Sequence, residues 1–515
     1  MTWHRMGRRK FVKMSGATLV AAGAVDLVGC ATAKPKAEGA TAGIGYFDRF
    51  GVTEAMLSEA LAAAMSRGAD SADVFFQHKV SSTLGMQDRA VNRSYAQVQL
   101  GVGVRAVKGD QQGYGYTEDL SPASIVECAR TAAAIADGPA GAAPQRLRVA
   151  GTLPDRYPVK VRWEDVRTEQ TMPIVSGLEE RILASDSRVR KVNLFFGDEY
   201  GAILIADSTG RIVEDFQPMT WLYAQCTAEQ DGKRESSGYN VAARAGLEYY
   251  DADRLARIAR EAVARTTILF EAVPAPAGEM PVVLAADSSG ILLHEAIGHG
   301  MEADFNRKNV SIFSDKIGKP VARPFVNIVD DATLPNARGT INVDDEGNAA
   351  GLTHLVENGI LSTYLHDSIS ARHYGVKPTG NGRRENYQFA PLPRMRATYM
   401  LPGPHSKEEI VASVKKGIYC SNFTNGQVNI GAGDFTFYVK NGFLIEDGKL
   451  TRPVKDVNVI GNGPKVLEKI DMVANDLVVD EGGWTCGKAG QGVPVSQGIP
   501  TVRVSSITVG GQGKG

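Results

Sequence analysis

Two histidines in one short apolar segment constrain the fold of this chain more than any other feature. Residues 291–300 read ILLHEAIGHG, so Glu295 follows His294 directly and His299 lies five residues after His294. On a regular α-helix, five residues turn the chain through about 500°, which leaves the two imidazoles about 140° apart. A single π-type turn, with hydrogen bonds from residue i to i+5, would bring both onto one face. Gly298 favours that distortion because glycine resists a regular helix. The spacing therefore predicts a bulged helix.

The residue types on this helix are those of a metal-dependent hydrolase. Neutral imidazoles of His294 and His299 are good zinc ligands. Glu295 would take a proton from the attacking water as general base. A buried helix with two hydrogen-bonded histidines is the structural alternative. Only eight histidines occur in the chain, so two of them beside a glutamate favour the metal site.

A catalytic zinc site needs a third protein ligand and one open position. Cys486 stands in a glycine-flanked loop, GGWTCGK at 482–488, whose flexible flanks would let a thiolate approach an ion. A purely structural role for such a cysteine is also compatible with this loop. The remaining candidates for the third ligand are Glu302, Asp304, His354, His366 and His373.

Length and composition indicate a globular protein of two or three domains. The chain has 515 residues, with 43% hydrophobic and 22% charged residues. The net charge of −1 argues against nucleic acid as the main partner. Five cysteines are too few for a disulfide framework. Many of the 56 glycines follow Asn or Asp, which predicts tight hairpins and a high strand content.

The pattern along the chain predicts an α+β fold. Helices are expected at 53–67, 121–136 and 253–267, and strands at 74–76 and 97–107, in a mixed α/β domain of residues 44–272. The proline-rich stretch at 273–278 is the expected boundary. A strand-rich domain of residues 273–515 then carries the metal-binding helix after a strand at 282–286. Hairpins are expected at Asn358-Gly359, Asn441-Gly442 and Asp447-Gly448, and a last strand at 501–509.

Residues 1–43 are interpreted as an export signal and tether. Arg8 and Arg9 precede an apolar residue and a lysine, as in a twin-arginine signal, and a weakly apolar run leads to LVGC, which resembles a lipobox ending at Cys30. That run is too short to span a bilayer as a stable helix. The expected location is the periplasm, either free or attached to a membrane only through a lipid anchor on Cys30. A disordered tail on a cytosolic protein is the alternative.

Several ordered blocks together resemble the TldD/PmbA family of metallopeptidases. The sharpest block is HEAIGHGMEADFNRK at 294–308; others are PLPRM at 391–395, YMLPG at 399–403, LIEDGK at 444–449 and the loop around Cys486. The N-terminal half also fits, through GADSAD at 68–73 and GVGVR at 101–105. The resemblance extends over nearly everything from Tyr46 onward.

The resemblance implies a catalytic member of TldD type. It implies zinc held by His294, His299 and Cys486, with Glu295 as base. It also implies cleavage of unfolded or small peptides inside a homodimer, or inside a heterodimer with a PmbA/TldE-like paralogue. This chain has Ala489 where the family usually has an acidic residue. The alternatives are a non-catalytic peptide-binding or assembly subunit and a zinc hydrolase of non-peptide amides. Substrate-binding residues are not identifiable from the sequence.

Overall fold

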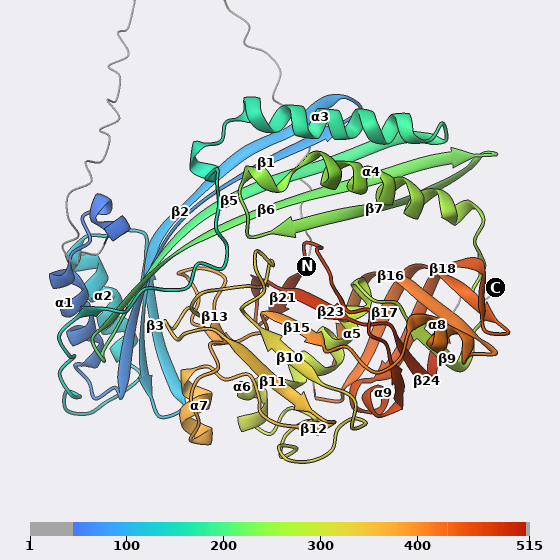
Figure 1. Cartoon of the computed structure of the whole chain (residues 1–515). Helices are drawn as coiled ribbons and strands as arrows, with labels where there is room; N and C mark the ends of the chain where they lie inside the picture. Colours follow the sequence, from blue (N-terminus) through green and yellow to red (C-terminus); the bar gives the residue numbers. More distant parts are fainter. Residues whose placement is uncertain (1–44, 430, 511–515) are drawn as a thin grey trace, which may run out of the picture. The chain divides into compact units, whose positions relative to one another are not determined.

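A long antiparallel sheet organises the N-terminal half of the computed structural model, which describes residues 45–429 and 431–510 (Figure 1). The expected export signal, with Arg8, Arg9 and Cys30, lies outside the described residues. The elements of this half are η1 (Gly45–Phe50), α1 (Glu54–Met65), β1 (Ser71–Gln87), β2 (Ala90–Lys108), β3 (Gln111–Thr117), α2 (Pro122–Ala133), β4 (Arg148–Val149), η2 (Trp163–Asp165), α3 (Thr168–Ser185), β5 (Val189–Asp207), β6 (Arg211–Gln230), β7 (Lys233–Ala243), η3 (Leu247–Tyr249), α4 (Ala252–Thr267) and η4 (Ile268–Phe270).

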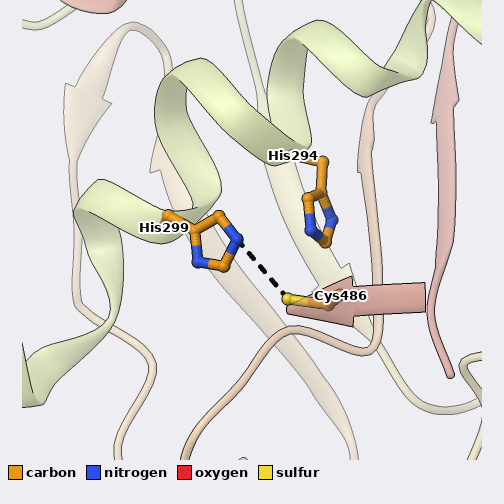
Figure 2. A group of neighbouring side chains, drawn as sticks. All are labelled: His294, His299 and Cys486. Atoms are coloured by element: carbon orange, nitrogen blue, oxygen red, sulfur yellow. Dashed lines mark hydrogen bonds between the residues drawn. The ribbon is translucent and has the colours of Figure 1, made fainter. Parts of the chain in front are cut away.

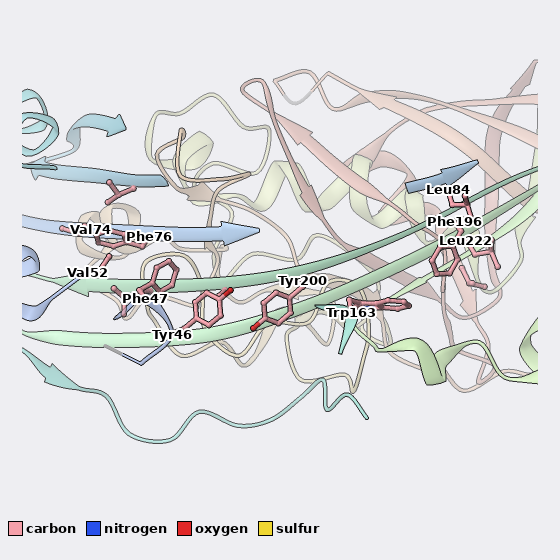
Figure 3. Packing of buried hydrophobic residues seen from close by; sticks show 14 of the residues in the cluster. Tyr46, Phe47, Val52, Val74, Phe76, Leu84, Trp163, Phe196, Tyr200 and Leu222 are labelled. Atoms are coloured by element: carbon pink, nitrogen blue, oxygen red, sulfur yellow. The ribbon is translucent and has the colours of Figure 1, made fainter. Parts of the chain in front are cut away.

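The two faces of this sheet are used differently. Its strand order is β3-β2-β1-β5-β6-β4, with β7 also paired to β6, and α3 and α4 cover one face (Figure 1). Because side chains alternate along a strand, Leu204 and Leu222 join the core on the helix side. Residues such as Phe196 and Trp163 belong to the same apolar cluster (Figure 3). The opposite face packs against the C-terminal half, where Ile203 contacts the buried Tyr387.

The C-terminal half consists of many shorter elements. They are β8 (Val273–Pro274), β9 (Gly278–Leu284), η5 (Ser288–Gly290), α5 (Ile291–Leu293), η6 (His294–Gly298), η7 (His299–Met301), α6 (Ala303–Arg307), β10 (Ile328–Asp331), β11 (Leu352–Glu357), β12 (Ile360–Leu361), α7 (Ser368–Tyr374), β13 (Gly382–Arg383), β14 (Leu392–Pro393), β15 (Ala397–Met400), α8 (Lys407–Ala412), β16 (Lys416–Val428), β17 (Asp434–Glu446), β18 (Lys449–Asn462), α9 (Gly463–Lys469), β19 (Ile470–Val473), β20 (Val478–Val479), β21 (Thr485–Lys488), β22 (Gln491–Pro494), β23 (Ser496–Ile499) and β24 (Val502–Gly510).

Two larger sheets enclose the helical segment at 291–307. One runs β12-β11-β10-β15-β23-β20, and the other runs β19-β24-β9-β16-β17-β18-β8. The second sheet closes on itself, because β24 pairs with both β9 and β18. The segment between them is buried along most of its length, with Ile291, Leu293 and Ile297 all in the core of this half. The sheets therefore hold the histidine helix away from solvent.

The structure confirms the α+β class with its strand-rich C-terminal half. The three expected helices are α1, α2 and α4, and Ser121 caps α2 ahead of Pro122, as predicted. The hairpins at Asn358-Gly359 and Asp447-Gly448 are also confirmed. The division of the chain at residues 43 and 272 stays a prediction. No helix in the described ranges has the length and apolar character needed to cross a membrane.

One expected hairpin is wrong, and one expected strand is longer than predicted. Asn441-Gly442 is not a turn but lies inside β17, where Gly442 pairs with Cys420. A Cβ on Gly442 would lie 2.2 Å from the Tyr419 carbonyl oxygen, so this glycine permits close strand approach instead. The strand expected at 74–76 is confirmed as part of the first half of β1, which has 17 residues. Its second half carries polar side chains that gave no strand signal.

Candidate metal centre

The histidine helix begins at a sharp turn after β9 and contains the predicted π-turn. Residues His294–Gly298 form a π-helix, and the His299 N–H donates to the His294 carbonyl, which is the i to i+5 bond that the spacing required. Gly298 has a packing role as well. A Cβ at this position would lie 2.0 Å from the Met395 sulfur, and Met395 is fully buried. The distorted helix and its neighbours are therefore fitted to one another.

Cys486 reaches this helix from a short hairpin formed by β21 and β22. Thr485 and Gly487 are exposed on one face of β21, and Cys486 and Lys488 are buried on the other. The hairpin is fixed from behind by Arg394, whose guanidinium donates to the Cys486 carbonyl at 2.5 Å. Arg394 is fully buried. The strand register thus points the Cys486 sulfur at the histidines and not at the opposite face.

The three predicted ligands converge on one point (Figure 2). Their ligand atoms all lie within 4.8 Å of one another, and all three side chains are buried. The His294 and His299 ring centroids are 5.1 Å apart, and Cys486 Sγ is 3.5 Å from His299 Nε2. Two nitrogens and one sulfur at this separation form a donor set that Zn²⁺ prefers.

The charges around these atoms favour an ionised thiol. Burial raises the pKa of Cys486, but His294 and His299 lower that pKa to well below its ordinary value. Burial lowers the pKa of His299, but Glu302 and Cys486 raise it well above its ordinary value. A thiolate held beside imidazole nitrogens is the state in which cysteine binds metals.

A buried carboxylate fixes the orientation of His299. Glu302 Oε2 lies 3.0 Å from His299 Nδ1 and 3.0 Å from Lys488 Nζ. Burial opposes ionisation of Glu302, but Lys488 and His299 lower its pKa to about 2. Because an ionised carboxylate only accepts hydrogen bonds, His299 Nδ1 carries the proton and Nε2 faces Cys486. Lys488 also pairs with Asp304, at 2.7 Å.

His294 supplies an independent test of whether a metal fits. Its Nδ1 is buried, and no residue in the described part of the chain hydrogen-bonds to it. A buried polar atom without a partner is rare in native proteins and calls for an unseen ligand. Together with the thiolate of Cys486, this nitrogen suits a metal ion.

The other candidates for the third ligand lie elsewhere or have other partners. Glu302 and Asp304 belong to the network around Lys488, so they support the centre from outside it. His354 is half exposed beside Glu357. His366 packs against Tyr374, and His373 pairs with Asp110. The sequence did not indicate Lys488 or Arg394 as site residues, although both stand in the blocks that resemble the family.

Glu295 is half-buried at the edge of the centre. Its side chain lies beside Gly426 of β16, where a Cβ would be 3.4 Å from Glu295 Cγ. No residue in the described ranges hydrogen-bonds to the Glu295 carboxylate. A carboxylate free of protein partners next to a metal-binding cluster is available to accept a proton from water.

Two cavities flank the hairpin that carries Cys486. One, of about 400 Å³, lies between β5, β6 and the hairpin, and the other, of about 550 Å³, lies between β6, β7 and β16. They share Tyr223, Gly483 and Thr485 in their walls. Both cavities lie on the Thr485 face of the hairpin, and neither of them is lined by His294, His299 or Cys486.

Comparison with known proteins gives a consistent result along the chain. Residues 72–136 match the PmbA/TldA metallopeptidase domain 1, residues 162–270 the central domain and residues 277–511 the C-terminal domain. The metalloprotease TldD homolog of Haemophilus influenzae is 40% identical over 452 residues, which cover 86% of this chain and 94% of that protein. The zinc metalloprotease TldD homolog of Saccharolobus solfataricus is 35% identical over 46% of this chain and 52% of that protein.

A solved structure shares the fold at lower identity. TldE from Thermococcus kodakarensis superposes with a TM-score of 0.69 at 17% identity, covering 86% of this chain and 97% of that one. The fold, the buried ligand cluster and the sequence matches define a metallopeptidase. Within that class, the chain belongs to the PmbA/TldD family.

Proposed function

We propose that this metallopeptidase is a zinc enzyme that cleaves unfolded or small peptides. The observation that carries the proposal is that His294 and His299, on a π-distorted helix, converge with Cys486 of β21. The ligand atoms of the three residues lie within 4.8 Å of one another. The Saccharolobus solfataricus relative is named a zinc metalloprotease, which supports the choice of metal. The two cavities beside the Cys486 hairpin support the choice of substrate, because volumes of about 400 and 550 Å³ hold a short stretch of peptide and not a folded domain.

The roles follow from the geometry. A zinc ion bound by the three ligands would polarise the scissile carbonyl and acidify water. Glu295 takes the proton of the attacking water and delivers it to the leaving amine. Glu302 holds His299 in the tautomer that presents Nε2, and Lys488 holds Glu302.

Digestion of a peptide library with and without a chelator tests the proposal. Cleavage should stop with the chelator and return with added zinc. A matched pair of variants identifies the ligands: Cys486→Ala should lose zinc by elemental analysis, and Cys420→Ala should retain it. Cys420 is a suitable control because it is equally buried but does not belong to the group of converging ligand atoms. Full zinc content in Cys486→Ala would move the third ligand elsewhere.

The partner and the location are further proposals. We propose that the chain works as a homodimer or as a heterodimer with a PmbA/TldE-like paralogue, since its fold is that of TldE. Light scattering of the protein alone and after co-expression with such a paralogue tests this. We also propose twin-arginine export and lipidation at Cys30. Arg8→Lys with Arg9→Lys should block export, and a mature membrane-free protein with its N-terminus intact would refute the proposal.

A further inference from the structure

The smaller cavity beside the Cys486 hairpin is lined by arginines from three separate segments. Strands β5 and β6, with Trp221 and Tyr223, line one side of it, and the hairpin β21–β22 lines another. Arg244, Arg338, Arg383 and Arg384 line its side, and Arg384 forms an ion pair with Asp73 at 3.4 Å. The cavity holds about 400 Å³, which is enough for several residues of a peptide end.

Arg244 is the least explained of these arginines. It is only 3% exposed, yet its guanidinium forms no hydrogen bond or ion pair with any residue that the structure describes. Its nearest support is the Tyr157 ring, with the guanidinium carbon 5.5 Å from the ring centroid. The charge of Arg244 lowers the pKa values of Asp345 and Asp215, but neither carboxylate forms an ion pair with it. A ligand that paired directly with this buried guanidinium would therefore stabilise it.

Arg338 and Arg383 bind only neutral acceptors. Arg338 donates to the Trp484 carbonyl at 2.9 Å and to the Thr485 hydroxyl at 3.2 Å. Arg383 donates to the Met395 carbonyl at 2.6 Å. Burial lowers the pKa of both, to about 9 for Arg383, and the charge of Arg244 lowers each further. The charge of Arg244 therefore acts on both Arg338 and Arg383.

The acids that line the cavity have partners of their own. Glu199 pairs with Lys79 at 3.6 Å. Glu385 accepts from the Gly492 N–H at 2.6 Å, and Asp345 accepts from the Arg384 N–H at 2.7 Å. Burial raises the pKa of Asp345, which faces Arg383 and Arg244, although the arginines lower it in part. The cavity thus keeps a positive potential aimed at its interior.

We propose that Arg244, Arg338 and Arg383 bind a carboxylate of the peptide substrate and so position the chain for cleavage. The inference rests on the proposed peptidase function and names its substrate class. The carboxylate is either the C-terminus of the peptide or an acidic side chain. A peptide held there continues over Gly483 and Thr485 into the second cavity, which is lined by Phe423 and Thr424 of β16. Gly426 of the same strand lies beside Glu295.

Binding of matched peptides tests the site without relying on turnover. The probe is a fluorescent octapeptide without acidic residues, made with a free C-terminal carboxylate or a C-terminal amide, plus an amide version with one Glu. Affinities are measured by anisotropy on the full, zinc-loaded chain carrying Glu295→Gln, with mass spectrometry to confirm that the peptides stay intact. Losing a charge-assisted contact should weaken binding roughly 10- to 100-fold.

The expected result is that one carboxylate peptide binds at least tenfold more tightly than the plain amide. A preference for the free C-terminus assigns the α-carboxylate, and a preference for the Glu peptide assigns the side chain. Arg244→Met should abolish the preference and raise Tm, because it removes an unpaired buried charge. Arg130→Met, at an exposed arginine on α2, should change neither quantity.

Equal affinities for all three peptides in the parent protein would overturn the carboxylate site, whatever the behaviour of the variants. Retention of the preference in both Arg244→Met and Arg338→Met would do the same. These outcomes are separate from failure of the peptidase proposal. That failure would appear as chelator-resistant cleavage by the wild type, which the binding assay does not measure.

Discussion

At the scale of single residues, the carboxylates of Glu295 and Glu302 are expected to have different roles, the first as general base and the second as the group that orients His299. Glu295→Gln keeps size and shape but removes basicity, so the variant should hold zinc and cleave at least about a hundredfold more slowly. Glu302→Gln should instead weaken zinc binding by about 10- to 100-fold, because it disturbs the orientation of His299. His294→Ala should lose metal and activity together. Zinc titration beside initial rates separates these effects; loss of zinc in Glu295→Gln, with activity restored by excess zinc, would transfer the base role to another carboxylate.

Ala489 occupies a position that does not suit alanine. It has a φ of 50° and precedes Gly490, with a φ of 74°, in the two-residue turn between β21 and β22. Both angles lie in the left-handed region, where Asn and Asp are tolerated better than Ala. Ala489→Asn or Ala489→Asp should therefore raise the free energy of unfolding by about 1 kcal/mol with little change in rate. Chemical denaturation measures the gain, and a large rate change would assign the position to catalysis.

At the scale of elements, the π-turn depends on a glycine that packs against the core. Gly298→Ala should cost about 1–3 kcal/mol of stability, because its Cβ would overlap the Met395 sulfur. Zinc affinity should fall with it, since both imidazoles move if the turn does. The matched control is Gly177→Ala in α3, where a Cβ meets nothing within 4 Å. That change should stabilise the protein by about 0.5–1 kcal/mol, and equal effects of the two substitutions would contradict the packing role of Gly298.

The elements that the sequence predicted are those whose signals are local. Helices α1, α2 and α4 have caps and apolar spacing, and the π-turn follows from two histidines and a glycine. Helix α3 was missed because Pro173 and Gly177 lie inside it. Strands β1 and β2 were predicted only in part, and β5, β6 and β7 were not predicted, because their polar halves are supported by neighbours from distant segments. From the residues alone, Cys486 is one of six candidates for the third ligand, since it joins the histidines only through tertiary contacts. Only the family resemblance selects it.

At the scale of the whole molecule, the proposed zinc ion joins segments that are far apart in the chain. An ion that binds the native state alone stabilises it, by about 4 kcal/mol when free ion exceeds the Kd roughly a thousandfold. Chelation should therefore lower Tm in calorimetry, and zinc should restore it. Cys486→Ala should show a low Tm that does not respond to the chelator. A wild-type Tm that ignores the chelator would contradict a structural coupling between ion and fold.

The wide separation of the ligands also has a consequence during synthesis. His299 and Cys486 are 187 residues apart, so a ribosome adding about 5–20 residues per second needs roughly 10–40 s to deliver the thiol after the imidazole. During that interval the growing chain is itself an unfolded peptide, the kind of substrate proposed for the finished enzyme. It carries the histidine helix but not the sulfur ligand. A growing chain of this protein therefore lacks a complete centre with which to cut itself until its Cys486 hairpin has been made.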